Sequence, residues 1–270
     1  MILRIIVLSI PFLIFLICFF YFKLHIRLNH LLITVIGALP FVWLLSYAAV
    51  HIDGLEIITD LQIFLLIAFI STGTMGVMTL IFFFRDPARI SPDDPDIVLS
   101  PADGTIRYVK RCSEGNIPVS EKGGRKMPLH QLIQTDLMNM NVMIIGIEMS
   151  LFDVHVNRSP ISGLILFQSH KHGFFHSLRN PAYLENERTV TLIENQKMRV
   201  AVIQIASRLV RRIVSYHKIG DTLKSGERIG KICFGSQVDI IIPITDNLKI
   251  NIKAGQYVKA GLSVIATYVA

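Results

Sequence analysis

The chain has 270 residues, a formal net charge of +7, 51% hydrophobic residues and a mean hydropathy of +0.51. This composition is too apolar for an ordinary soluble protein, and most of the apolar excess precedes Arg85. An odd count of 3 cysteines excludes a fully paired disulfide framework. The basic residues are scattered and no basic run is interleaved with aromatic residues, so no nucleic-acid partner is predicted.

Three apolar stretches without a charged residue precede Arg85: Ile5–Phe22, Leu31–Val50 and Leu61–Phe84. Each is long enough to cross a hydrocarbon core of about 30 Å as a helix. The first stretch is too long for a signal peptide and has no small-residue cleavage site before Lys23. We therefore expect residues 1–84 to be a membrane anchor with three transmembrane helices. The alternative is two such helices and an interfacial first segment.

The charges of the connecting loops predict an orientation. Lys23 and Arg27 follow the first stretch, and Arg85 and Arg89 follow the third. The loop 51–60 between the second and third stretches has three acidic residues and no Lys or Arg. Because positively charged loops stay on the cytoplasmic side, residues after 84 are expected on the cytoplasmic face of the cell membrane.

Residues 85–101 are rich in Pro and Asp, which is typical of a linker. Residues 102–270 form the expected catalytic domain, which is mainly β with few helices. Short β-type runs separated by Gly, Asn and Asp turns predict an antiparallel sandwich or barrel. These runs are Thr105–Val109, Val142–Ile147, Leu164–Phe167, Thr189–Ile193, Val200–Ile205, Ile213–Tyr216, Val238–Ile242 and Leu262–Tyr268, with helices considered only at Leu129–Met138 and Ser207–Arg212.

Two segments near the C-terminus share one glycine pattern, Ile219–Gly230 and Ile252–Ala266. The pattern looks like the half-motif of lipoyl-type barrels, so we expect barrel-sandwich elements of that kind. In carriers with that fold, the modified lysine lies between the two halves. Here Gly235-Ser236 lies there, so a swinging-arm carrier is not predicted.

Gly235 and Ser236 interrupt a strand-like run that continues into Val238–Ile242. A glycine inside a strand often marks a β-bulge, which is the simpler interpretation of this pair. The alternative is a bend that places the Ser236 hydroxyl beside an exposed backbone carbonyl. That arrangement would suit chemistry on the chain itself.

Asp103 and His155 could supply the other groups that such chemistry needs. A serine hydroxyl attacks only after a base takes its proton, and a carboxylate commonly orients a histidine base. Asp103 before Gly104 is also ordinary turn chemistry, and a lone histidine at 155 could be a simple structural residue. The order Asp, His, Ser is compatible with a serine hydrolase, although the G-x-S-x-G pattern is absent.

Five short motifs follow one another between residues 83 and 243, in the same order as in the family named below. They are Phe83-Phe84-Arg85-Asp86-Pro87, Leu99-Ser100-Pro101-Ala102-Asp103-Gly104, Asp153-Val154-His155-Val156-Asn157-Arg158-Ser159-Pro160, Glu185-Asn186-Glu187-Arg188 and Phe234-Gly235-Ser236-Gln237-Val238-Asp239. In these motifs the chain resembles the phosphatidylserine decarboxylase proenzyme family, in particular its short, membrane-anchored branch that includes archaetidylserine decarboxylases.

The resemblance implies a self-processing enzyme. Asp103 would orient His155, which would deprotonate Ser236 for attack on the Gly235 carbonyl. Cleavage would leave a β subunit of residues 1–235 and an α subunit of residues 236–270. The α subunit would begin with a pyruvoyl cofactor made from Ser236, which forms a Schiff base with the amine of a serine phospholipid during decarboxylation. The lipid tails, diacyl or archaeal ether, and the homo-oligomeric state are left open.

The chain departs from the family pattern in four places, one of which is its extra apolar N-terminal span. Gln237 stands where relatives usually carry Arg, so a charge contact near the processed serine is in doubt. Phe152 stands where longer relatives have a second histidine. Residues 110–140 are longer than expected of the short branch.

Two further groups of side chains were considered for binding. Arg208, Arg211 and Arg212 could bind a lipid phosphate, with a solvated basic face as the alternative. His170, His172 and His176 have no nearby carboxylate or cysteine in the sequence, so no metal site is predicted.

Two other functions compete with the decarboxylase. One is a membrane-anchored serine hydrolase that uses Asp103, His155 and Ser236 without self-cleavage. The other is a non-enzymatic, lipoyl-like membrane adaptor. Detection of a small C-terminal fragment would separate both from the proenzyme.

Overall fold

The computed structural model describes the chain over part of its length, mainly in its C-terminal two thirds. The described residues are 44, 69, 72–74, 76, 77, 79–113, 120–122, 125–127, 140–171, 187–206, 213–233 and 236–269. They belong to two compact units, one of Met1–Phe84 with Ser150–Phe152 and one of Arg85–Met149 with Asp153–Ala270.

In the first unit, the described residues from Thr79 to Phe84 are helical. Across the parts of the chain that are described, we find no helix with the length and apolar character needed to cross a membrane. The expected spans Ile5–Phe22 and Leu31–Val50 lie outside the described residues, apart from Leu44, and Leu61–Phe84 is described only in part. The transmembrane anchor stays a prediction.

The second unit is built of antiparallel β-strands. Its strands are β1 (Ile97–Leu99), β2 (Gly104–Cys112), β3 (Ser120–Lys122), β4 (Arg125–Met127), β5 (Val142–Met149), β6 (Val156–Arg158), β7 (Gly163–Lys171), β8 (Arg188–Glu194), β9 (Arg199–Ala206), β10 (Ile213–Ser215), β11 (Thr222–Leu223), β12 (Arg228–Ile232), β13 (Ser236–Pro243), β14 (Leu248–Ile250), β15 (Tyr257–Val258) and β16 (Val264–Tyr268).

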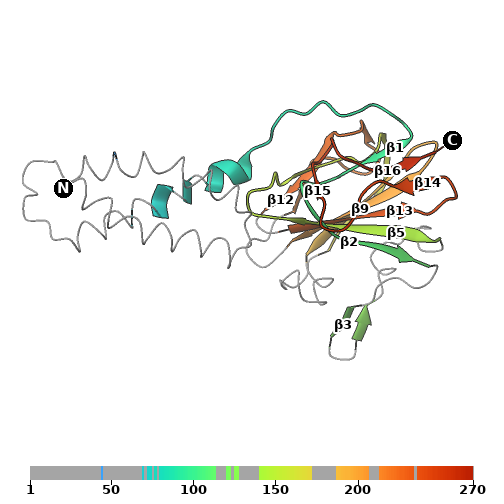
Figure 1. The fold of residues 1–270 in the computed structure, drawn as a ribbon, viewed down its shortest axis with the longest axis horizontal. Coiled ribbons are helices and arrows are strands. Elements are labelled where there is room, and N and C mark those ends of the chain that lie inside the picture. The colour runs from blue at the N-terminus through green and yellow to red at the C-terminus, as the bar shows by residue number, and fades with distance from the viewer. Residues whose placement is uncertain are drawn as a thin grey trace, which may run out of the picture. The chain divides into compact units, whose positions relative to one another are not determined.

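The largest sheet has eight strands in the order β11-β7-β8-β9-β13-β5-β2-β15. Two three-stranded sheets, β1-β16-β14 and β10-β12-β6, and the hairpin β3-β4 complete the strand pairing. Figure 1 shows β13 beside β9 and β5, with β2 next to β5. Strand β13 is thus a central strand that is paired on both sides.

The two faces of the eight-stranded sheet bury different side chains, because successive residues of a strand point to opposite faces. Val238, Ile240 and Ile242 belong to the larger core cluster, whereas Ile241 belongs to a second cluster with Ile203. Burial on both faces explains the apolar run Ile240-Ile241-Ile242 of β13.

The two glycine-patterned segments adopt matching turns. Gly220 and Gly226 in the first segment, and Gly255 and Gly261 in the second, have positive φ angles between 69° and 92°. The second glycine of each segment lies against the other, since a Cβ built on Gly261 would lie 3.3 Å from the Gly226 Cα. The repeat read from the sequence is therefore a structural repeat whose halves meet.

All eight predicted β-type runs are strands or contain strands. Both helices that were considered, 129–138 and 207–212, lie outside the described residues. The segment 85–101, where a linker was expected, includes the buried strand β1 paired with β16. It therefore contributes to the second unit, because Ile97, Val98 and Leu99 supply a short apolar strand inside a Pro- and Asp-rich sequence.

Candidate active site

Ser236 opens strand β13 at the centre of the large sheet. Its register partners are Met149 on β5 and Ala206 on β9. Gly235 and the Ser236 side chain lie outside the described residues. The described backbone therefore places the candidate cleavage point where the chain enters a central strand.

His155 is buried, with 2% of its surface exposed, and precedes β6. Its Nδ1 lies 2.8 Å from the carbonyl oxygen of Asp153. Burial lowers the pKa of His155 to about 4, against the opposing effect of the Asp153 carbonyl and of the Asp153 and Asp103 charges. The imidazole is therefore neutral near pH 7 and available to accept a proton.

Backbone and side-chain contacts bring the His155 segment to the end of β13 where Ser236 lies. The Ile232 amide, four residues before Ser236, donates to the His155 carbonyl at 3.1 Å. Two residues after His155, the side-chain amide nitrogen of Asn157 lies 3.9 Å from the sulfur of Met149, which is the register partner of Ser236 on β5. The predicted base and the predicted nucleophile thus come from segments that meet in the fold.

Asp103 is held by an arginine that the sequence did not single out for the site. Arg89 Nη1 and Nη2 donate to the two carboxylate oxygens of Asp103 at 2.6 and 2.8 Å, and the Ala260 amide donates to Oδ1 at 2.7 Å. Asp103 also acts on His155, because its negative charge raises the pKa of the imidazole. The role of orienting His155 stays a prediction for Asp103.

Asp153 is a second carboxylate near His155 that sequence reasoning missed. Tyr257, on β15, donates its hydroxyl to Asp153 Oδ1 at 2.8 Å. The charge of Asp153 raises the pKa of His155, and this effect is larger than that of Asp103. The spacing of two residues between Asp153 and His155 was the available signal in the sequence.

A further ion pair joins two of the five sequence motifs. Arg158 Nη2 lies 3.3 Å from Asp86 Oδ1, and the same guanidinium donates to the carbonyls of Pro87 and Gly226. Arg158 is 4% exposed, so this guanidinium holds Asp86-Pro87 against the strand that follows His155. Asp86 and Pro87 of the first motif thus lie beside Arg158 of the third.

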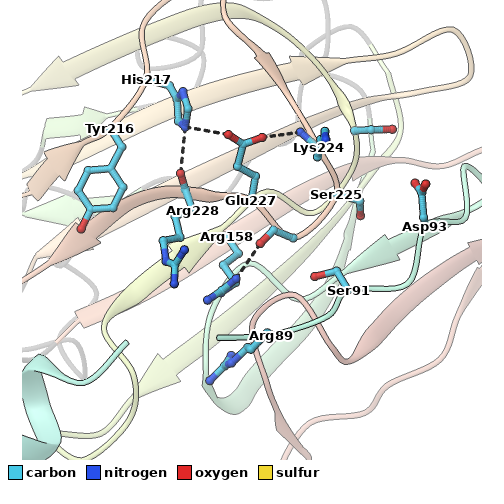
Figure 2. Close-up of a pocket in the computed structure, with 12 residues that line it drawn as sticks. Arg89, Ser91, Asp93, Arg158, Tyr216, His217, Lys224, Ser225, Glu227 and Arg228 are labelled. Atoms are coloured by element: carbon cyan, nitrogen blue, oxygen red, sulfur yellow. Dashed lines mark hydrogen bonds and ion pairs between the residues drawn. The ribbon is translucent and has the colours of Figure 1, made fainter. Parts of the chain in front are cut away.

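Beside this ion pair lies an open pocket of about 860 Å³. Figure 2 shows Arg89, Arg158 and Arg228 at its wall, with Glu227 turned toward His217. The arginines are paired within the protein, since Arg89 binds Asp103 while Arg158 and Arg228 both bind Asp86. This neutralisation disfavours a strongly anion-selective pocket.

Other predicted binding residues are described only in part. Arg208, Arg211 and Arg212 lie outside the described residues, as do His172 and His176. His170 Nδ1 lies 2.9 Å from the Thr189 hydroxyl, and its Nε2 lies 3.3 Å from Glu187.

The structure gives two of the sequence departures a setting. Phe152 packs edge-to-face on Phe82, with their ring centroids 5.9 Å apart. Gln237 accepts a hydrogen bond from Arg107 Nη1 at 3.3 Å. The guanidinium of Arg107, on β2, therefore contacts the residue after Ser236. This contact was not predicted from the sequence.

The sequence was compared with those of known proteins. The sequence profile described as "Phosphatidylserine decarboxylase" matches residues 79–266. The chain is 40% identical over 186 residues to the "Putative archaetidylserine decarboxylase proenzyme" of Methanothermobacter thermautotrophicus, covering 69% of this chain and 79% of that protein. It is 39% identical over 191 residues to the protein of the same name from Methanocaldococcus jannaschii, covering 69% and 88%.

A bacterial relative, the "Phosphatidylserine decarboxylase proenzyme" of Trichlorobacter lovleyi, is 36% identical over 187 residues, covering 68% of this chain and 74% of that protein. The profile match includes Asp103, His155 and Ser236. With this profile, these relatives and the five ordered motifs, the chain belongs to the phosphatidylserine decarboxylase family.

Proposed function

We propose that the chain is a proenzyme that cleaves itself between Gly235 and Ser236 and then decarboxylates a serine phospholipid. The observation that carries the proposal is the buried, neutral His155, whose segment is hydrogen-bonded to the chain entering Ser236. Family membership supports the same reaction class.

In the cleavage step, His155 accepts the proton of the Ser236 hydroxyl as its oxygen attacks the Gly235 carbonyl. The amide bond between the two residues is replaced by an ester, and the amino group of residue 236 takes up a proton. Loss of the α-proton of residue 236 then breaks the ester by β-elimination and frees the Gly235 carboxylate. Addition of water and release of ammonia leave a pyruvoyl group at the start of the α subunit.

The residues around Ser236 fit this group. Ser236 begins β13, so a chain break before it interrupts no described strand pairing. The pyruvoyl group supplies a carbonyl that reacts with the substrate amine and accepts the electrons released when carbon dioxide leaves. His155 holds or returns a proton near this position, while Asp103 and Asp153 favour its protonated form through their charges.

Two further parts of the proposal rest on the sequence. Residues 1–84 would anchor the enzyme in the membrane with the β unit on the cytoplasmic side, where a lipid substrate is accessible. Arg208, Arg211 and Arg212 would contact the lipid phosphate. The names of the relatives include both archaetidylserine and phosphatidylserine, so both lipids belong in the assay.

Denaturing electrophoresis and intact mass of the purified full chain test the proposal. The wild type should yield a fragment of 35 residues (270 minus 235) that lacks a free amino terminus and reacts with carbonyl reagents. Ser236→Ala should leave one uncut, inactive chain, whereas Ser169→Ala, a control serine on strand β7, should be cut and active. An active wild-type preparation that contains only full-length chain would contradict the proposal.

A further inference from the structure

A cluster of two buried and two half-buried polar side chains holds the residue that follows Ser236. Asp239 accepts hydrogen bonds from the Tyr108 hydroxyl at 2.7 Å and from Gln237 Nε2 at 2.6 Å. Gln237 Nε2 also lies 3.0 Å from the Tyr108 hydroxyl, and its Oε1 accepts from Arg107 at 3.3 Å. We call Arg107, Tyr108, Gln237 and Asp239 the Asp239 cluster.

The cluster spans three strands and depends on one glycine. Tyr108 lies on β2 and Asp239 on β13, with β5 between them in the sheet. The Tyr108 ring crosses β5 at Gly146, where an added Cβ would lie 2.5 Å from the ring carbon Cζ. Only a residue without a side chain leaves room for this crossing.

A β-bulge in β2 brings the second donor to the cluster. The register of β2 against β5 shifts between Ile106 and Tyr108, so Arg107 is the extra residue. A bulge re-aims side chains locally, which allows Arg107 and Tyr108 to reach the same strand although they are adjacent in sequence. Gly146 and the bulge in β2 together allow Arg107 and Tyr108 to donate hydrogen bonds to side chains of β13.

The donors of the cluster match an ionised carboxylate. Each carboxylate oxygen of Asp239 accepts one of these hydrogen bonds. An ionised carboxylate can accept hydrogen bonds but has none to donate. A protonated Asp239 would present a donor to the Tyr108 hydroxyl, which already donates in this arrangement. Burial raises the pKa of Asp239 to about 6, opposed by the bonds from Tyr108 and Gln237 and by the charges of Arg107 and Lys110.

The titratable groups on the face of the sheet that carries Asp239 lie on five other strands. The register partners of Asp239 are Gly146 on β5 and Ile203 on β9, so neither adjacent strand places a charge directly opposite. The strand register places the following described titratable side chains on the face of the eight-stranded sheet that carries Asp239. These groups are Arg107, Tyr108, Lys110 and Cys112 of β2, Glu148 of β5, Arg188 and Glu194 of β8, Lys171 of β7 and Arg199 of β9.

We propose that Asp239 is a positioning residue for cleavage at Gly235–Ser236, holding the entrance of β13 through Gln237 and Tyr108 while its carboxylate is ionised. This inference rests on the proposed function. Gln237 is completely buried and adjoins Ser236, so fixing its side chain restrains the backbone next to the bond to be cut. Attack within a chain requires such restraint, because a small displacement of the reacting atoms slows it strongly.

The test follows cleavage of full-length precursor made by cell-free synthesis in the presence of membranes, with rates measured at several values of pH. Wild-type cleavage should slow about tenfold between pH 7 and pH 5, as Asp239 with a pKa near 6 loses its charge. Protonation of His155, near pH 4, should give a separate, lower decline. Asp239→Asn should cleave at least tenfold more slowly at pH 7 and lose the decline between pH 7 and pH 5.

Two more variants keep the test decisive if Asp239→Asn folds poorly. Tyr108→Phe keeps the ring over Gly146 but removes one donor to the carboxylate, so the midpoint of the decline should move above pH 6. Tyr268→Phe is the matched control, since its hydroxyl donates to Pro243 at the far end of β13, at 3.4 Å. It should retain the wild-type rate and pH profile.

The outcomes separate this inference from the proposed function. Wild-type rate and pH profile in Asp239→Asn, or an unshifted midpoint in Tyr108→Phe, would overturn the positioning role alone. Slower cleavage of Asp239→Asn with the pH 6 decline retained would also overturn it, as a purely structural effect. A wild-type chain that is never cut would overturn the proposed function and this inference with it.

Discussion

Arg89 and Asp103 form a two-pronged ion pair, with 7% and 4% of their side chains exposed, across 14 positions of sequence. Removing one partner of a buried pair leaves the other charge uncompensated. Arg89→Ala should therefore lower the free energy of unfolding by about 3–5 kcal/mol, measured by urea denaturation. Arg89→Lys, which keeps the charge but not the fork, should lose less. An unchanged urea midpoint in Arg89→Ala would contradict this account.

His155 and Asp239 should affect stability with opposite dependence on pH. The pKa of His155 falls from 6.5 to about 4 on folding, so its contribution to stability is lost as pH falls through that range. The pKa of Asp239 rises from 3.8 to about 6, so its contribution is lost as pH rises through that range. Each shift corresponds to roughly 3 kcal/mol.

Urea unfolding at pH 4 and pH 7, in the uncut Ser236→Ala background, measures both effects. Between these values, the stability of Asp239→Asn relative to the parent should rise by roughly 3 kcal/mol, and that of His155→Gln should fall by a similar amount. Parallel pH curves for parent and variants would show that neither group titrates as described. Ionised Asp239 is thus expected to reduce stability at neutral pH, a cost consistent with a role in function.

Gly146→Ala tests the crossing of Tyr108 over β5. The added methyl group would collide with the Tyr108 ring, so the substitution should cost about 1–3 kcal/mol and disturb the Asp239 cluster. In a Tyr108→Ala background the same substitution should cost much less, because the ring is gone. A double-mutant cycle measures this coupling, and purely additive costs would exclude the proposed collision.

The glycine turns allow a comparison of strain with close contact. Gly220 and Gly226 both have positive φ angles, but a Cβ at Gly220 meets nothing within 4 Å, whereas one at Gly226 collides with Ser91. Gly220→Ala should cost about 1–2 kcal/mol from backbone strain alone. Gly226→Ala should cost more by thermal or urea unfolding. Equal costs would show that the Ser91 contact relaxes freely.

The strands that the sequence predicted are those with enough apolar, β-branched residues to show their pattern. β9 and the second half of β13 are buried on both faces and are rich in apolar residues. β6 and β15 have three and two residues, too few for any periodicity to be visible. Strand β1 is hidden for the same reason inside the Pro- and Asp-rich segment.

The candidate site could be predicted in its residues but not in its contacts. Asp103 and His155 were recognisable by residue type and by family motif. The partner of Asp103 was not, because Arg89 comes from a segment without a regular pattern. The contact from Arg107 to Gln237 depends on a bulge in β2, and the sequence carries no mark of that extra residue.

The central position of β13 bears on whether the chain folds before the proposed cleavage. Three strands of residues 236–270 pair with strands of residues 1–235: β13 with β9 and β5, β15 with β2, and β16 with β1. Released before folding, such a short peptide would expose Ile240-Ile241-Ile242 and be prone to aggregate. The proposed cut at Gly235–Ser236 would therefore have to follow closure of the sheet around β13. The resulting fragment would be a non-exchangeable part of the core, inseparable from the larger one without unfolding both.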